Sequence, residues 1–151
     1  AMSRTGHVLV TWSQNGRTSG ARLLASGSVG EPPVELAPVE GAWPAIGDSG
    51  DGAVAYGVED APAIGRGLVR LRPVAQAWGP PEEIVPPTAG TPFMRVAVDR
   101  DGNVATAWTR FTAGGRPDGG AAYRPARTGS WESAGVLTLD DGAVRAVVRS
   151  R

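Results

Sequence analysis

The sequence predicts an all-β protein built from antiparallel strands. Glycine (22) and proline (13) are frequent among the 151 residues, and they separate short apolar stretches. Turn signals at roughly ten-residue spacing are typical of antiparallel β structure. Residues 66–77 come nearest to helical length, but Pro73 and several β-branched residues favour a strand there.

Composition excludes several classes of function. Cysteine is absent, which excludes disulfides, thiolate zinc sites and a cysteine nucleophile, and a single histidine excludes multi-histidine metal sites. Fifteen arginines balance fifteen acidic residues, without the basic excess of a nucleic-acid binder. No apolar run approaches the length of a membrane span. We therefore expect no cofactor, no metal, no nucleic acid and no membrane partner.

The chain repeats itself with a period of 40–50 residues. Four glycine-led strands begin at Gly6, Gly52, Gly102 and Gly142, and the first three glycines are 46 and 50 residues apart. A second landmark falls at Val29, Trp78 and Trp131, which are 49 and 53 residues apart. Two landmarks that share a period indicate repeated structural units.

The second glycine-led strand has one bulky face and one small face. Val54, Tyr56 and Val58 alternate with Ala53, Ala55 and Gly57. Because successive side chains of a strand point to opposite faces, this strand is expected between two other sheets.

Units of this length, each expected to hold four strands, predict the blades of a β-propeller or partial propeller. We expect one repeat domain over 1–151, with about three units at 6–37, 43–86 and 92–137. The strands of the third unit are expected at 93–98, 103–111, 120–126 and 130–137. The first unit lacks its leading strand, and extra C-terminal strands are expected at 138–149.

The stretch from Val96 to Trp108 and the later Gly129-Ser-Trp131 resemble bacterial propeller repeats related to sialidase-like (Asp-box) propellers. The Asp-box pattern itself is not matched, because Gly102 directly follows Asp101. The resemblance implies an extracellular or cell-surface location, whereas the first residues show no signal peptide and leave the location unknown.

Three blades are fewer than a closed propeller uses, which is roughly four to eight. We therefore expect a homo-oligomer, in which two chains form a six-bladed ring, or completion by the remainder of a longer chain.

Candidate chemistry is sparse. The segment Asp99–Asn103 is similar to the start of a calcium loop, but the later oxygen ligands are missing, so a tight turn is expected. His7 has no nucleophile motif beside it, and no catalytic residue is assigned. The candidate ligand-binding residues are aromatic or basic side chains suited to sugar stacking and hydrogen bonding: Trp12, Trp43, Trp108, Tyr56, Arg70 and Arg124.

The favoured function is a non-enzymatic propeller module that binds a glycan or a protein at repeated inter-blade or face sites. One alternative is a fragment of a sialidase-like glycoside hydrolase, although no triad is identified by spacing. A second alternative is a self-assembling structural propeller fragment without a ligand.

Overall fold

The computed structural model describes residues 1–24, 26–111 and 114–138. Sheet 1 contains β1 (Val8–Gln14), β2 (Arg17–Leu23) and β3 (Val34–Ala37). Sheet 2 contains β4 (Trp43–Ile46), β5 (Gly52–Ala61), β6 (Ile64–Arg72) and β7 (Glu82–Ala89). Sheet 3 contains β8 (Phe93–Val98), β9 (Val104–Phe111), β10 (Pro117–Arg124) and β11 (Glu132–Thr138).

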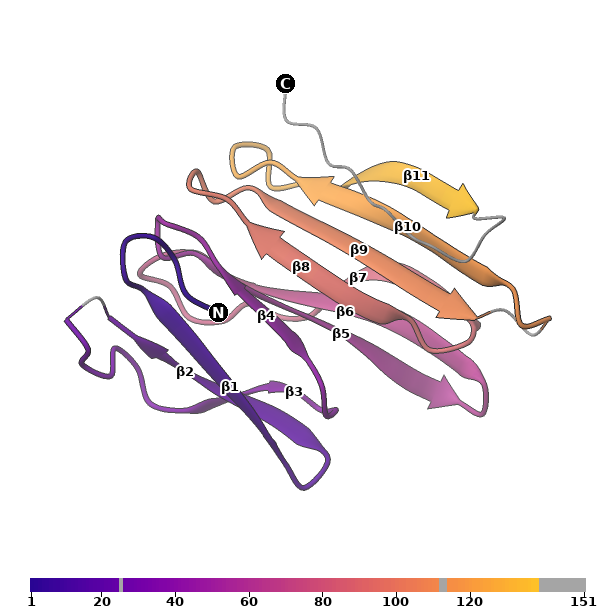
Figure 1. Cartoon of the computed structure of the whole chain (residues 1–151), viewed down its shortest axis with the longest axis horizontal. Helices are drawn as coiled ribbons and strands as arrows, with labels where there is room; N and C mark the ends of the chain where they lie inside the picture. The colour runs from indigo at the N-terminus through magenta and orange to yellow at the C-terminus, as the bar shows by residue number, and fades with distance from the viewer. Residues whose placement is uncertain (25, 112–113, 139–151) are drawn as a thin grey trace.

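Each sheet is an antiparallel meander in which strands adjacent in sequence are also adjacent in the sheet. The predicted all-β class is confirmed, and the described residues contain no helix. The sheets follow one another as layers, with sheet 2 between the other two (Figure 1). They are consistent with the blades of a partial propeller, and the described part of the chain does not close a ring.

The first sheet has three strands, so the predicted lack of a leading strand is confirmed, and an isolated bridge stands in its place. The amino group of Ala1 donates to the Leu9 carbonyl, and Met2 bridges to Val8. This segment occupies the place that β4 and β8 occupy in the other sheets. The C-terminal strands expected at 138–149 lie outside the described residues, apart from residue 138 at the end of β11.

A shared turn connects the leading segment of each sheet to its second strand. The backbone N–H of its first residue donates to the carbonyl of its fifth, in Ser3–His7, Gly47–Asp51 and Asp99–Asn103. The fourth residue is always a glycine with positive φ: 84° at Gly6, 90° at Gly50 and 79° at Gly102. The equivalent of Gly6 and Gly102 is therefore Gly50, and the sequence alignment on Gly52 was wrong by two residues.

The corrected alignment places an aromatic residue at the same position of every second strand. Trp12, Tyr56 and Trp108 each lie six residues after their turn glycine. The second landmark keeps its predicted phase. The backbone N–H of Gly30, which follows Val29, donates to the carbonyl of Arg22. The backbone N–H of Gly79, which follows Trp78, donates to the carbonyl of Leu71, the residue equivalent to Arg22.

Sheet 2 is buried on both faces, as the alternation on β5 predicts. Val54 and Tyr56 belong to a hydrophobic cluster with Leu9 and Leu36 of sheet 1. The alanines of the other face, Ala53 and Ala55, belong to a second cluster with residues of sheet 3. That second cluster also contains Met94, Val96, Val104 and the partly buried Trp108. Between sheets 2 and 3, large side chains of the later sheet therefore pack on the alanine face of β5. Between sheets 1 and 2, Val54 and Tyr56 instead meet the leucines of sheet 1.

The close approach of sheets 2 and 3 depends on Gly57. A Cβ atom at Gly57 would lie 2.2 Å from the backbone oxygen of Pro92, which leads into β8. We predict that Gly57→Ala lowers the free energy of unfolding by about 2 kcal/mol, because a backbone atom must move. Urea unfolding measures this loss, and Gly114→Ala, with no atom within 4 Å of the new Cβ, is the control. Equal midpoints for the two variants would contradict the packing described.

Candidate functional site

Two similar clusters of an arginine, a glutamate and a tryptophan lie between neighbouring sheets. The first cluster consists of Arg72 and Trp78 from sheet 2 and its following loop, with Glu31 from the β2–β3 loop of sheet 1. The second cluster consists of Arg124 and Trp131 from sheet 3 and its following loop, with Glu82 at the start of β7.

In the first cluster the guanidinium is almost enclosed. Arg72 is 3% exposed, and its Nε donates to Glu31 Oε2 at 3.0 Å while Nη2 pairs with Glu31 Oε1. The two contacts form a bidentate ion pair that joins sheet 2 to sheet 1. Trp78 packs against the cluster of apolar residues between the two sheets, and its ring lies 3.4 Å from where a Cβ of Gly52, the residue paired with Arg72, would be.

In the second cluster the polar groups are more open. Glu82 Oε2 accepts a hydrogen bond from Trp131 Nε1 at 2.6 Å and lies 3.7 Å from Arg124 Nε. The side chain of Arg124 is 23% exposed and that of Glu82 is 36% exposed. The hydrogen bond fixes the orientation of the indole, which packs on the core between sheets 2 and 3.

The repeat places the arginine and the tryptophan together. Arg72 pairs across the sheet with Gly52, and Arg124 pairs with Val104 at the equivalent position. Each tryptophan follows its arginine by six or seven residues, where the chain turns toward the outer strand. Sheet 1 carries Leu23 and Val29 at these positions. Among the described sheets, the pair thus occurs only where another sheet precedes it.

A second buried arginine lies near the first cluster. Arg22 is 8% exposed, and its Nη2 donates to His7 Nδ1 at 3.4 Å. Burial and then the positive charge of Arg22 lower the pKa of Arg72. Arg22 Nε and Arg72 Nη1 are buried without a hydrogen-bond partner in the described structure, as is Arg124 Nε of the second cluster. The first cluster thus has a second arginine close to its own.

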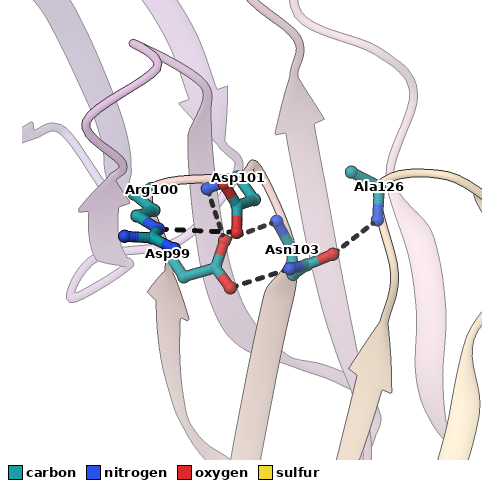
Figure 2. A network of polar contacts seen from close by, with 5 residues as sticks. All are labelled: Asp99, Arg100, Asp101, Asn103 and Ala126. Carbon is teal, nitrogen blue, oxygen red and sulfur yellow. Dashed lines mark hydrogen bonds and ion pairs between the residues drawn. The ribbon is translucent and has the colours of Figure 1, made fainter. Parts of the chain in front are cut away.

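The acidic turn of sheet 3 is held by its own polar groups (Figure 2). Asp99 Oδ1 accepts from the backbone N–H groups of Asp101 and Asn103, both at 2.9 Å, and Oδ2 accepts from Asn103 Nδ2. Asn103 Oδ1 in turn accepts from the Ala126 N–H at 3.0 Å. These contacts form the turn expected from the sequence, and they engage both oxygens of Asp99. Within the described ranges, no group of three or more acidic, histidine or cysteine side chains could hold a metal ion.

The six sequence-derived candidates do not form one site. Tyr56 is 2% exposed between sheets 1 and 2, and Arg70 lies on the same face of sheet 2. Arg70 Nε donates to the Gly79 carbonyl and Nη1 to the Glu35 carbonyl, both at 2.9 Å. The guanidinium therefore joins two sheets by backbone contacts.

The indoles lie in three different places. Trp108 packs in the core between sheets 2 and 3. Trp12 is 38% exposed on β1, and Trp43, at the start of β4, is 43% exposed. The guanidinium carbon of Arg95 lies 3.6 Å from the centroid of the Trp43 ring, which is a cation–π contact. Only Arg124 belongs to one of the two clusters.

Sequence reasoning left Trp78 and Trp131 as landmarks and did not connect them with Arg72, Glu31 or Glu82. The signal available was the repeated spacing from arginine to tryptophan in the second and third units. The glutamates come from the preceding sheet, and nothing in the spacing connects them to the arginines.

Comparisons with known proteins add little. No family model and no curated protein matches the chain. A solved structure, a fucose lectin from Kordia zhangzhouensis in complex with methyl-fucoside, has a TM-score of 0.47 and 12% sequence identity to this chain. That match covers 89% of this chain and 94% of the lectin chain. In the described residues, no helix is long and apolar enough to cross a membrane.

Burial raises the pKa of Tyr56, while Arg70 and Arg66 oppose the rise. Its hydroxyl is buried without a hydrogen-bond partner in the described structure. We predict that Tyr56→Phe leaves the free energy of unfolding unchanged or raises it by about 1 kcal/mol, because an unsatisfied polar atom is removed. The raised folded pKa also predicts that the wild type loses stability as the pH rises above about 10, the usual tyrosine value. Urea unfolding of wild type and Tyr56→Phe at neutral and alkaline pH measures both effects. If Tyr56→Phe lowers the free energy of unfolding at neutral pH by more than about 1 kcal/mol, the Tyr56 hydroxyl has a hydrogen-bond partner and the prediction is wrong.

Partial burial raises the pKa of Asp99, but hydrogen bonds from Asn103 and Asp101 outweigh it, so the net shift is downward. A lowered folded pKa means that the ionised turn stabilises the fold above the unfolded pKa, about 3.9, and stops doing so as the pH falls through the folded pKa. We predict that Asp99→Ala lowers the unfolding midpoint at pH 7 and that the difference from wild type narrows in acid. Asp101→Ala, whose carboxylate is outside this hydrogen-bond set, is the control. If the unfolding midpoints of Asp99→Ala and wild type differ equally at pH 7 and in acid, the ionised Asp99 carboxylate does not stabilise the turn.

Proposed function

We propose that this protein is a non-enzymatic carbohydrate-binding module whose sugar sites are the two arginine–glutamate–tryptophan clusters. The observation that carries the proposal is the second cluster, where a partly exposed guanidinium, a partly exposed carboxylate and an indole converge from two sheets. The first cluster repeats the same three residue types one period earlier in the chain.

The chemistry of the cluster suits a sugar. Neighbouring hydroxyls each donate and accept hydrogen bonds, so a carboxylate beside a guanidinium offers the complementary pair. A flat indole offers an apolar surface to the C–H groups of a pyranose ring, and its N–H is already satisfied by Glu82. A few fixed polar groups beside an aromatic surface are typical of small-molecule sites.

The two sites are expected to differ in strength. Arg72 is enclosed and bound to both oxygens of Glu31, so few of its donors face outward. Arg124 has one 3.7 Å contact with Glu82 and greater exposure. The second cluster is therefore the stronger site in this proposal.

The test begins with a glycan array and continues with calorimetric titration of the best methyl glycoside. We predict that Trp131→Ala or Glu82→Gln weakens binding about tenfold or more, which corresponds to about 1.4 kcal/mol. Trp78→Ala is expected to remove a second, weaker binding event.

Phe111→Ala removes an exposed aromatic ring outside both clusters and is the matched control. Circular dichroism must show that each variant is folded. Loss of binding in Trp43→Ala with full binding in Trp131→Ala would support the site predicted from sequence and overturn the clusters. Hydrolysis of a fluorogenic sialoside by the protein would overturn the non-enzymatic assignment.

A further inference from the structure

The face of sheet 1 that points away from sheet 2 exposes large apolar side chains. Leu9 of β1 is buried toward sheet 2, so Val8, Val10 and Trp12 lie on the opposite face. Val10 is 42% exposed and Trp12 is 38% exposed, and Val29 on the same face is also exposed. Grouped apolar side chains on a surface are typical of an interaction site.

The equivalent residues of the other sheets form the contacts between sheets. Val10 and Trp12 correspond to Val54 and Tyr56, which pack on sheet 1. In sheet 3 the equivalent aromatic is Trp108, which packs against the cluster that contains Ala55 of sheet 2. The face of β1 therefore has the composition of a contact face whose preceding sheet is absent.

Sheet 3 offers the complementary surface. Ala105 and Ala107 of β9 occupy the positions of Ala53 and Ala55, on the face directed away from sheet 2. Both alanines are partly exposed. A large-on-small contact of the kind seen between sheets 2 and 3 would join β1 of one chain to β9 of another.

We propose that two copies of this chain close a ring through two such contacts, sheet 1 of each packing on sheet 3 of the other. Closed propellers contain roughly four to eight blades, and six is the only multiple of three in that range. A head-to-tail contact that closes gives a finite assembly rather than a fibre. Leu23 and Val29 replace the arginine and tryptophan at this junction. The ring then carries two sugar sites per chain rather than three, a corollary that rests on the proposed function.

Light scattering on a size-exclusion column over a concentration series tests the assembly. The expected mass is about twice the 15.5 kDa of the chain. Val10→Asp is expected to halve the mass, whereas Ile64→Asp, a β-branched residue of matching exposure at the β5–β6 hairpin, keeps the dimer. A folded monomer at every concentration, or equal masses for the two variants, would overturn the proposal.

Cross-linking tests the geometry without relying on a disruptive variant. The chain has no cysteine, so Trp12→Cys combined with Ala107→Cys introduces the only pair. Sheet 2 separates the two positions within one chain, so a disulfide must join two chains. We expect a covalent dimer on a non-reducing gel, and each single variant is the control. Absence of the cross-link would overturn the contact, and a ladder of higher oligomers would overturn ring closure.

Discussion

The different sizes of the two faces of β5 determine how the described sheets pack on one another. The strand β5 packs on sheet 1 with one face and on sheet 3 with the other. Its two faces cannot both be bulky when both sheets lie this close. Val54 and Tyr56 fill the space toward sheet 1, while Ala53 and Ala55 leave room for Val104 and Trp108. Because protein interiors tolerate neither voids nor overlap, the alternation fixes both the spacing and the order of the layers.

The two charged clusters lie at the same contacts between sheets. Burying an ion pair between sheets costs desolvation free energy. Replacing such a pair by apolar residues of similar volume often leaves the protein equally stable. Leu23 and Val29 occupy the arginine and tryptophan positions in sheet 1, on the face that no described sheet covers. In the proposed function, these ionic pairs contribute to ligand recognition rather than to stability alone.

The strand pattern and the alternation of faces were accessible from the sequence because both depend on local periodicity. The turn register was not, since Gly50 and Gly52 both precede plausible strands. The hydrogen bond from Gly47 to Asp51 and the positive φ of Gly50 distinguish them. Trp78 and Trp131 were found in phase, but Glu31 and Glu82 reach their arginines across sheets. Contacts of that kind depend on how whole sheets are stacked, which one sequence does not reveal. The predicted candidates Tyr56 and Arg70 were chosen for chemistry that their burial and backbone contacts already use.

The meander topology has a kinetic consequence. Every described strand pair within a sheet joins segments that are consecutive along the chain, so pairing requires only short loops to close. Folding rates rise as contacts become more local, and each sheet is therefore able to form its strand pairs early. Docking of one sheet on the next then buries the apolar faces and becomes the cooperative, slower event. A chain emerging from the ribosome would complete its described sheets in order, and the exposed face of β1 would be covered only in the proposed dimer.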